Sequence, residues 1–194
     1  MRQSAVAVSA AILLAGCASI AAPPLAAQNP NAVQVSQQQG GKFIVLAGPK
    51  RRHGEPYLGI TSTNFDLLRS FIDTRTGEVA HQLYVQDSYG GPTRHWNAAR
   101  LANGQTLRFV PITVSEVTCE NGCSYAEEFA AALPEPLLRS SPQGLAVVFT
   151  SRSGNEKTIA VAPDLIAQQL AAVDGARAAR PAAAAPAPGP APPR

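Results

Sequence analysis

The sequence has little charge and few residues suited to a metal site. Only 15% of its 194 residues are charged, and its 3 histidines are scattered along the chain. All 13 acidic residues lie within residues 41–174, whereas Arg2, Arg177, Arg180 and Arg194 lie outside, so the body of the chain is close to neutral. A neutral body lacks the basic face with which proteins bind nucleic acid. The composition therefore predicts no nucleic-acid partner, no metal and no cofactor.

Motifs of the common catalytic classes are also missing. The chain has no GxSxG, no HExxH, no phosphate-binding glycine loop and no calcium loop. His81 lies on the apolar side of a predicted strand, where a core histidine is more common than a catalytic base. Glu127 and Glu128 are adjacent in a strand, so they point to opposite faces. These patterns favour a binding or structural module, with a hydrolase or carbohydrate-active enzyme built from loops as the alternative.

The apolar stretch near the N-terminus is too short to span a bilayer. It follows the positive charge of Arg2, reads "AVAVSAAILLAG" and stops at Cys17. A membrane-spanning helix needs about 20 apolar residues. A positive start, a short apolar centre and small residues at the end are typical of a secretory signal.

The end of this signal, Leu14-Ala15-Gly16-Cys17, resembles the lipobox of bacterial lipoproteins. The resemblance covers only the leader. It implies that signal peptidase II removes residues 1–16, that the Cys17 thiol receives a diacylglycerol, and that the new amino group is acylated. Ala18, where an Asp would favour the inner membrane, then implies an outer-membrane location facing the periplasm. The alternative is a soluble secreted binding protein that is cut after Ala27 and loses Cys17.

Composition divides the remaining chain into three parts. Residues 17–41, rich in Ala, Pro, Gln and Asn, predict a lipidated cysteine followed by a flexible tether. Residues 42–175 predict the folded domain. Residues 176–194, dominated by Ala and Pro, predict a disordered and extended tail. The membrane is the expected partner through the anchor, with envelope proteins, lipopolysaccharide or the cell wall as further candidates.

Short apolar segments separated by turn residues predict a mainly β domain. The expected hairpins pair residues 64–73 with 78–89, 95–101 with 105–114, and 145–152 with 157–162. About eight strands at this spacing indicate an antiparallel β-sandwich, Ig-like in general architecture, with a closed barrel as the alternative. Residues 163–175 change to a helical period, with Leu165, Ile166, Leu170 and Val173 on one stripe. They predict a C-terminal amphipathic helix with Gly175 just past its end.

The two remaining cysteines, Cys119 and Cys123, predict a disulfide. Their number is even once Cys17 is lipidated, and export places them in an oxidising compartment. Glu120-Asn121-Gly122 between them resembles a three-residue hairpin loop with Gly122 in the left-handed conformation. A redox-active pair and half of a metal site are the alternatives, although redox pairs of the thioredoxin kind have two intervening residues beside a helix.

Two clusters are candidate ligand surfaces. Arg94, His95 and Trp96 lie together in "GGPTRHWNAAR" and could hold a ligand, although a core tryptophan with two exposed neighbours explains them equally well. Lys50, Arg51 and Arg52, in "PKRRHGEP", form the densest basic cluster. Such a cluster could face anionic lipid head groups or lipopolysaccharide. The alternative is a solvated turn between two strands.

Overall fold

The computed structural model of the protein describes residues 29–38, 40–120 and 122–179. The predicted signal peptide, the lipidation site Cys17 and the part of the predicted tail from residue 180 onward lie outside the described residues. No helix in the described ranges is both long enough and apolar enough to cross a membrane.

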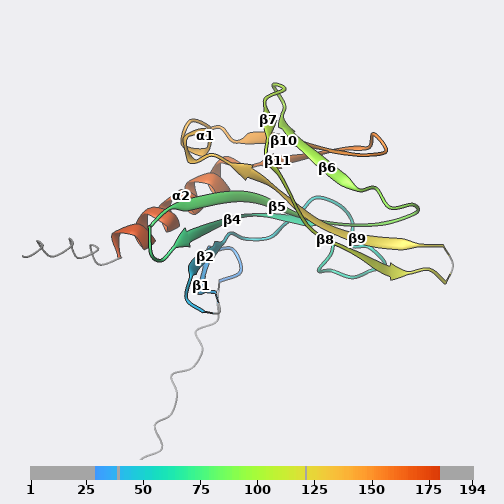
Figure 1. The fold of residues 1–194 in the computed structure, drawn as a ribbon, viewed down its shortest axis with the longest axis horizontal. Coiled ribbons are helices and arrows are strands. Elements are labelled where there is room, and N and C mark those ends of the chain that lie inside the picture. The colour runs from blue at the N-terminus through green and yellow to red at the C-terminus, as the bar shows by residue number, and fades with distance from the viewer. Residues whose placement is uncertain (1–28, 39, 121, 180–194) are drawn as a thin grey trace, which may run out of the picture.

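Two antiparallel β-sheets pack against each other, as the sequence predicts (Figure 1). The larger sheet has 7 strands in the order β1–β2–β4–β5–β9–β8, with β3 beside β4. These strands are β1 (Gln34–Gln37), β2 (Phe43–Ala47), β3 (Arg51–Arg52), β4 (Phe65–Asp73), β5 (Val79–Gly90), β8 (Phe109–Thr118) and β9 (Ser124–Leu133). The smaller sheet has 4 strands in the order β11–β10–β6–β7. They are β6 (Trp96–Leu101), β7 (Thr106–Leu107), β10 (Leu145–Ser151) and β11 (Glu156–Val161).

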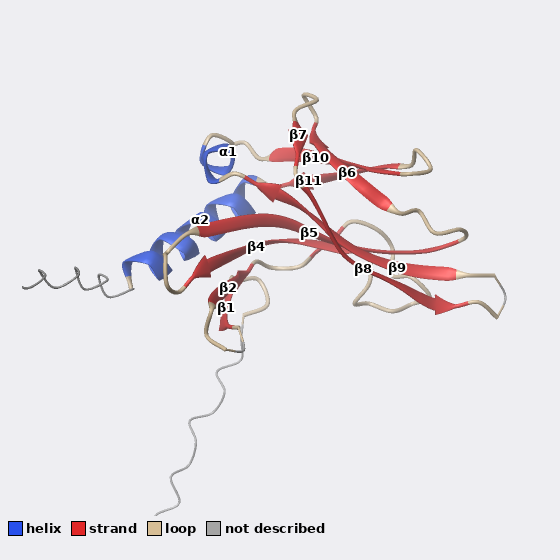
Figure 2. Cartoon of the chain, in the orientation of Figure 1, coloured by secondary structure: helices blue, strands red, loops and turns tan. Residues whose placement is uncertain are grey.

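The described residues also form the helices α1 (Glu135–Arg139) and α2 (Pro163–Ala178), which Figure 2 shows in blue. Helix α2 lies beside the small sheet on the same face of the large sheet, where it packs on β2 and β4 (Figure 1). Leu165 and Ile166 join the main core between the sheets, and Val173 packs with Leu46 and Ile72 in a second apolar cluster. The predicted C-terminal helix is therefore present and closes one side of the sandwich.

The predicted hairpins are present as β4–β5, β6–β7 and β10–β11. One expectation was wrong in detail, because residues 105–114 do not form a single strand. They divide at Arg108, so that β7 pairs with β6 in the small sheet and β8 pairs with β9 in the large sheet. This segment therefore links the two layers along one side of the sandwich.

The main core consists of aromatic and aliphatic side chains from both sheets. Its centre is the Phe129 ring, whose centroid lies 5.4 Å from that of Trp96, 5.8 Å from that of Phe109 and 4.9 Å from that of Phe149. Burial of one such large side chain stabilises the fold by about 1.5–3 kcal/mol. Because Phe129 and Phe109 belong to the large sheet and the other two rings to the small sheet, this cluster holds the sandwich together.

The folded domain is longer at both ends than residues 42–175. Strand β1 lies inside the segment predicted as a tether, where it pairs with β2 over residues 34–37 and Val33 packs on the second apolar cluster. Helix α2 continues past Gly175 to Ala178, into the segment predicted as a disordered tail. Ala176 packs on the same cluster, and Arg177 bonds to Glu135. Composition could not indicate these contacts because each depends on a distant strand or helix.

Candidate functional site

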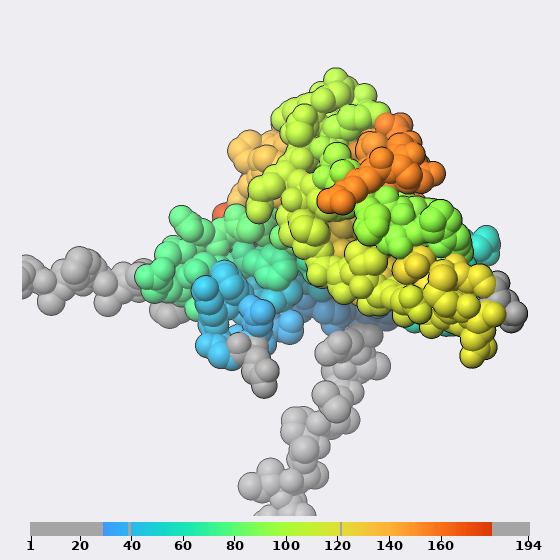
Figure 3. Space-filling model, turned by 45° about the vertical axis from the view of Figure 1, so that its right-hand side comes forward, coloured from blue at the N-terminus to red at the C-terminus, as the bar shows by residue number. Residues whose placement is uncertain are grey.

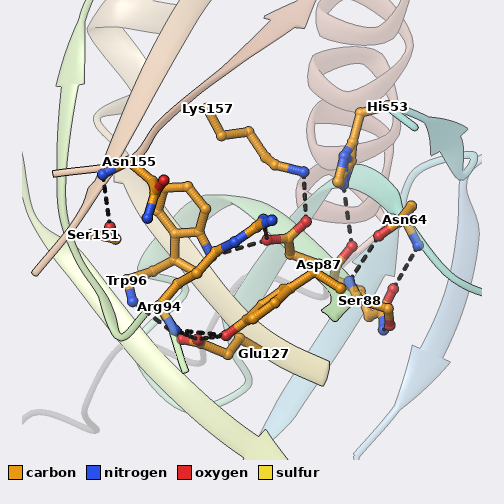
Figure 4. A network of polar contacts seen from close by, with 12 residues as sticks. His53, Asn64, Asp87, Ser88, Arg94, Trp96, Glu127, Ser151, Asn155 and Lys157 are labelled. Carbon is orange, nitrogen blue, oxygen red and sulfur yellow. Dashed lines mark hydrogen bonds and ion pairs between the residues drawn. The ribbon is translucent and has the colours of Figure 1, made fainter. Parts of the chain in front are cut away.

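The inner face of the large sheet changes from apolar to polar along β5 and β9. On β5 the inward-facing series runs through Leu83 and Val85 to Asp87 and Tyr89, all of them buried. The register pairs Val85 with Phe129 and Asp87 with Glu127. A network of polar contacts thus replaces the apolar core at this end of the sandwich, and Figure 4 shows it from close by.

Asp87 joins the two sheets. Its side chain is 2% exposed, and its Oδ2 atom accepts hydrogen bonds from Arg94 Nη1 at 2.9 Å and from Trp96 Nε1 at 3.0 Å. Its Oδ1 atom forms an ion pair with the ammonium of Lys157, which comes from β11 of the small sheet. A buried carboxylate is tolerated only when it is paired and hydrogen-bonded, and Asp87 meets both conditions.

Glu127 holds the loop that leads into β6. It is 2% exposed, and it accepts hydrogen bonds from three consecutive backbone N–H groups. Those of Arg94 and His95 bond to Oε1 at 3.1 Å and 2.9 Å, and that of Trp96 bonds to Oε2 at 3.1 Å. The left-handed conformation of His95, with φ of 55°, belongs to this arrangement.

Tyr89 also holds the loop before β6 in place. Its hydroxyl donates to Glu127 Oε1 and accepts the backbone N–H of Arg94 at 2.8 Å. Burial, together with the neighbouring Glu127 carboxylate, raises the pKa of Tyr89, so the hydroxyl stays protonated. The Arg94 guanidinium lies 3.9 Å from the centroid of the Tyr89 ring. The loop is therefore fixed from both its backbone and its side chains.

The structure brings the predicted cluster of Arg94, His95 and Trp96 together on this loop but gives the three residues different roles. Trp96 is 5% exposed and packs in the core, and Arg94 turns its guanidinium inward onto Asp87. His95 is the exposed member. Trp96 and Arg94 therefore hold the loop in place, and His95 is the member of the cluster that is open to solvent.

An apolar groove lies next to this network, between β8 and the loop before β6. Two adjoining hollows of about 330 Å³ and 230 Å³ share a lining of Trp96, Phe109, Pro111, Val114 and Glu127. Beside the groove, Figure 3 shows β8 (yellow-green) and the β10–β11 turn (orange) on one side of the molecule.

Strand β8 gives this groove an apolar rim. It is an edge strand of the large sheet, and it leaves Ile112, Val114 and Val117 at 40%, 52% and 45% exposure. His95 and Arg152 line the same hollow. The arrangement can hold an extended apolar segment with its polar groups near Arg152, and the Glu127 contacts fix the loop that borders it.

Two titratable residues, His53 and Asp66, lie beside the network. His53 Nε2 bonds to the carbonyl oxygen of Gln86 at 3.1 Å, so Nε2 carries the proton, and the buried Nδ1 has no hydrogen-bond partner. Burial, then the charge of Lys157, lowers the pKa of His53 to about 4. Burial raises the pKa of Asp66 to about 6, against the charges of Arg51 and Lys157.

A second polar cluster connects Ser70, His81 and Glu135. Gln169 Nε2 donates to Ser70 Oγ at 2.8 Å, and Ser70 Oγ lies 2.8 Å from His81 Nδ1. His81 Nε2 faces the carboxylate of Glu135, with Oε2 at 3.5 Å, so Nε2 carries the proton and the Ser70 hydroxyl donates to Nδ1. Burial lowers the pKa of His81, so its ring is neutral near pH 7. Ser70 is 0% exposed, so its hydroxyl is not presented to a substrate as a nucleophile.

The basic cluster lies on other elements than the loop before β6. Arg51 and Arg52 form β3, beside β4. Arg51 pairs with Asp164 at 3.0 Å, Arg52 Nη2 donates to the carbonyl oxygen of Thr61 at 3.2 Å, and Lys50 Nζ lies 4.2 Å from the centroid of the Phe65 ring. The structure therefore keeps the two predicted ligand surfaces as separate surfaces.

The turn between β8 and β9 brings Cys119 and Cys123 together as a disulfide pair, with their Cα atoms 3.9 Å apart. Gly122 has the expected left-handed conformation, with φ of 101°. The pair follows directly after the last register contact, Thr118 with Ser124, so it closes the tip of the hairpin.

Sequence reasoning missed the residues that organise the site, which are Asp87, Glu127 and Lys157. A signal for Asp87 was present, because it continues the inward series of His81, Leu83 and Val85 by one more step of two. For Glu127 the sequence gives only its neighbour Glu128, because its hydrogen-bond partners lie more than 30 residues away along the chain.

Among the described residues, no group of three or more His, Cys, Asp and Glu side chains gathers as metal ligands would. The carboxylates of Asp87 and Glu127 are instead occupied by cationic and N–H donors. Comparisons with models of protein families, with curated proteins and with solved structures give no match to this chain.

Proposed function

We propose that this chain is an exported lipoprotein of the bacterial envelope, anchored through Cys17, whose domain binds an extended apolar segment of another envelope protein. The lipobox-like Leu14-Ala15-Gly16-Cys17 supports the anchor. Ala18 favours the outer membrane, with the domain facing the periplasm. The disulfide pair Cys119–Cys123 fits an oxidising compartment of this kind.

The observation that carries the binding role is the apolar groove beside β8. An edge strand that exposes Ile112, Val114 and Val117 is a hazard for aggregation unless something covers it. Pro111 within the strand and two irregularities in its pairing with β9 discourage open-ended pairing of strands. Binding through side chains in the groove is compatible with both features.

The partner chemistry follows from the lining. Trp96, Phe109 and Val114 offer apolar contact, and Arg152, which lines the same hollow, offers a cation for an acidic group of the partner. An extended segment with alternating apolar side chains and a nearby carboxylate fits these groups. Because the Glu127 contacts fix the loop that borders the groove, little ordering of this loop is required when the partner binds.

Photocrosslinking in the native envelope tests the groove. A photoreactive residue at Val114 should give a discrete crosslinked partner, and the same residue at Arg75, in the β4–β5 turn, should not. Arg152→Gln should weaken the crosslink from position 114. Absence of any crosslink from position 114, or equal crosslinking from position 75, would rule out the groove as the binding surface.

Fractionation tests the anchor. Cys17→Ser should leave an uncut precursor or move the protein from the salt-washed membrane fraction to a soluble pool. The double variant Cys119→Ser/Cys123→Ser is the matched control and should stay with the membrane. If Cys17→Ser gives the same mature mass and the same fractionation as the parent, the anchor is wrong. A mature N-terminus at Gln28 would instead favour the soluble secreted protein.

The runner-up is a hydrolase or carbohydrate-active enzyme. The cluster of Ser70, His81 and Glu135 gives it no support, because Ser70 is sealed below α2 and hydrogen-bonds to Nδ1 of the histidine. We therefore place binding ahead of catalysis.

A further inference from the structure

A tight turn at residues 57–60 presents two large aliphatic side chains to solvent. Leu58 is 66% exposed and Ile60 is 47% exposed. The N–H of Ile60 donates to the carbonyl oxygen of Tyr57 at 2.9 Å. The hydroxyl of Thr63 accepts the N–H of Tyr57 at 2.8 Å and donates to the carbonyl oxygen of Ile60. These bonds hold the apolar tip in one shape.

The backbone of this turn is strained at Leu58. Leu58 and Gly59 both have left-handed conformations, with φ of 49° and 76°. Asn-Gly is the pair that such turns favour, because Asn adopts the left-handed region at a lower cost than Leu does. Leu58 recovers little of this cost in packing, because it is exposed. Its presence points to a contact outside the domain.

Basic residues flank the apolar tip. Arg52 donates to the carbonyl oxygen of Thr61, directly after the turn, and register places Arg52 opposite Phe65. The Nζ atom of Lys50 lies over the same Phe65 ring. Arg51 is paired with Asp164, which leaves Lys50 and Arg52 as the cations beside the tip. Residues 49–63 contain one acidic residue, Glu55, against these cations.

We propose that this corner, consisting of Leu58, Ile60, Lys50 and Arg52, contacts an anionic phospholipid surface. Aliphatic side chains at a rigid tip can enter the boundary between head groups and acyl chains, while Lys and Arg at its base attract anionic head groups. Both halves of this chemistry are present within one corner of the large sheet. An apolar protein surface would use the tip but would not require the two cations.

The length of chain between Cys17 and the domain limits how far the domain can lie from the membrane. The first described residue, Asn29, is 12 positions from Cys17, and a chain of that length spans at most about 40 Å. The domain therefore stays within reach of the bilayer if Cys17 is acylated. The location of the contact rests on the proposed anchor, but the contact itself can be measured without it.

Vesicle binding of the non-acylated chain is the test. The mature chain with Cys17→Ser is mixed with phosphatidylcholine vesicles that contain about one third phosphatidylglycerol, and with pure phosphatidylcholine vesicles. The proposal expects binding to the anionic vesicles that weakens with added salt. Lys50→Gln and Arg52→Gln should each weaken it about fivefold. Arg75→Gln, at the β4–β5 turn, is the matched control and should change it by less than about twofold.

Leu58→Asn separates a membrane role from a structural one. Asn suits the left-handed backbone, so this variant should melt at the same temperature as the parent or higher. Its vesicle binding should nevertheless fall about tenfold, because the aliphatic tip is lost. Val117→Asn, which removes an exposed aliphatic side chain from β8, should leave vesicle binding unchanged.

Three outcomes would overturn the proposal: no binding of the parent chain to anionic vesicles, equal binding to pure phosphatidylcholine, or full binding by Leu58→Asn. If the chain does not bind vesicles and a photoreactive residue at position 58 crosslinks to a protein, the corner belongs to a protein interface and the proposal is wrong. Failure of the anchor would appear separately, as unchanged fractionation of Cys17→Ser after a salt wash, and would leave the vesicle result intact.

Discussion

Asp87 and Glu127 lie directly opposite each other on β5 and β9, and both carboxylates are almost completely buried. Two buried carboxyl groups at this spacing need partners that satisfy their oxygen atoms. Asp87 pairs with Arg94 and Lys157, whereas Glu127 is held by backbone N–H groups and the Tyr89 hydroxyl. The pair therefore serves two purposes, since Asp87 ties the sheets together and Glu127 fixes the loop that borders the groove.

Replacement of Glu127 should loosen this loop. Glu127→Gln keeps the size of the side chain but places an NH₂ group against N–H donors, so at least one buried donor loses its acceptor. We expect a loss of about 2–4 kcal/mol in the free energy of unfolding, measured by urea denaturation. Faster hydrogen exchange at the amides of residues 94–96 should accompany it.

Glu128→Gln is the matched control for this experiment. Glu128 is adjacent to Glu127 but only half-buried on the opposite face of the sheet, so its replacement should cost less than about 1 kcal/mol. Equal losses from the two variants would contradict the role assigned to Glu127.

Asp66 makes the unfolding free energy depend on pH. Its pKa rises from 3.8 to about 6 on folding, because the buried carboxylate is desolvated. Its stabilising contribution is therefore complete below pH 3.8 and is lost as the pH rises through 6. Asp66→Asn should be more stable than the parent at about pH 7.5, by an amount on the order of 2 to 3 kcal/mol. This difference should vanish near pH 4, and a difference that does not change with pH would contradict the prediction.

His53 acts in the opposite direction. Its pKa falls from 6.5 to about 4 on folding, so its contribution is present above pH 6.5 and is lost as the pH falls toward 4. In the parent chain the two effects largely offset each other between pH 4 and 6. His53→Gln should therefore gain stability relative to the parent as the pH falls through this window, in urea denaturation at several pH values. A gain on raising the pH would show that the sign is wrong.

The hairpins could be predicted from the sequence because their signals are local. Asn103-Gly104 and Ser153-Gly154-Asn155 sit between segments of strand character, and the turns that result join neighbouring strands. The helical stripe of α2 was visible for the same reason, because its period repeats within a few residues. Strands, turns and helices that depend on signals within about ten residues could therefore be predicted from the sequence.

The site could not be predicted because its contacts join distant parts of the chain. Lys157 meets Asp87 across 70 residues, and its role depends on the packing of one sheet on the other. Strand β1 carries mainly polar residues and exists because β2 offers it an edge. The exposure of Leu58 likewise depends on a left-handed turn, and the pair Leu-Gly is not a sequence signal for that turn.

The disulfide pair should add modest stability. A loop closed by Cys119 and Cys123 is short, so the bond removes little chain entropy, and we expect about 1–2 kcal/mol in the free energy of unfolding. Denaturation of the double variant Cys119→Ser/Cys123→Ser measures this amount. Peptide mapping without reductant, on protein taken from the periplasm, should find the two cysteines linked, and free thiols at both positions would refute the prediction.

The C-terminal end of the domain can be located by truncation. A cut after Ala179 should leave the melting temperature within about two degrees, because it removes only residues beyond the helix. A cut after Gly175 removes Arg177, whose guanidinium makes two hydrogen bonds of 2.8 Å to Glu135. Both partners are partly exposed, so the loss should be about 1 kcal/mol, or about 2–4 °C.

A cut before Pro163 removes all of α2 and should prevent folding, because its buried side chains complete both apolar clusters. Thermal unfolding followed by circular dichroism distinguishes the three chains. The variant Arg177→Gln in the full chain separates the ion pair from the shortening of the helix, and it should reproduce most of the loss seen after Gly175. If the cut after Ala179 were as damaging as the cut after Gly175, residues 180–194 would contribute to the fold, and the domain would not end with α2.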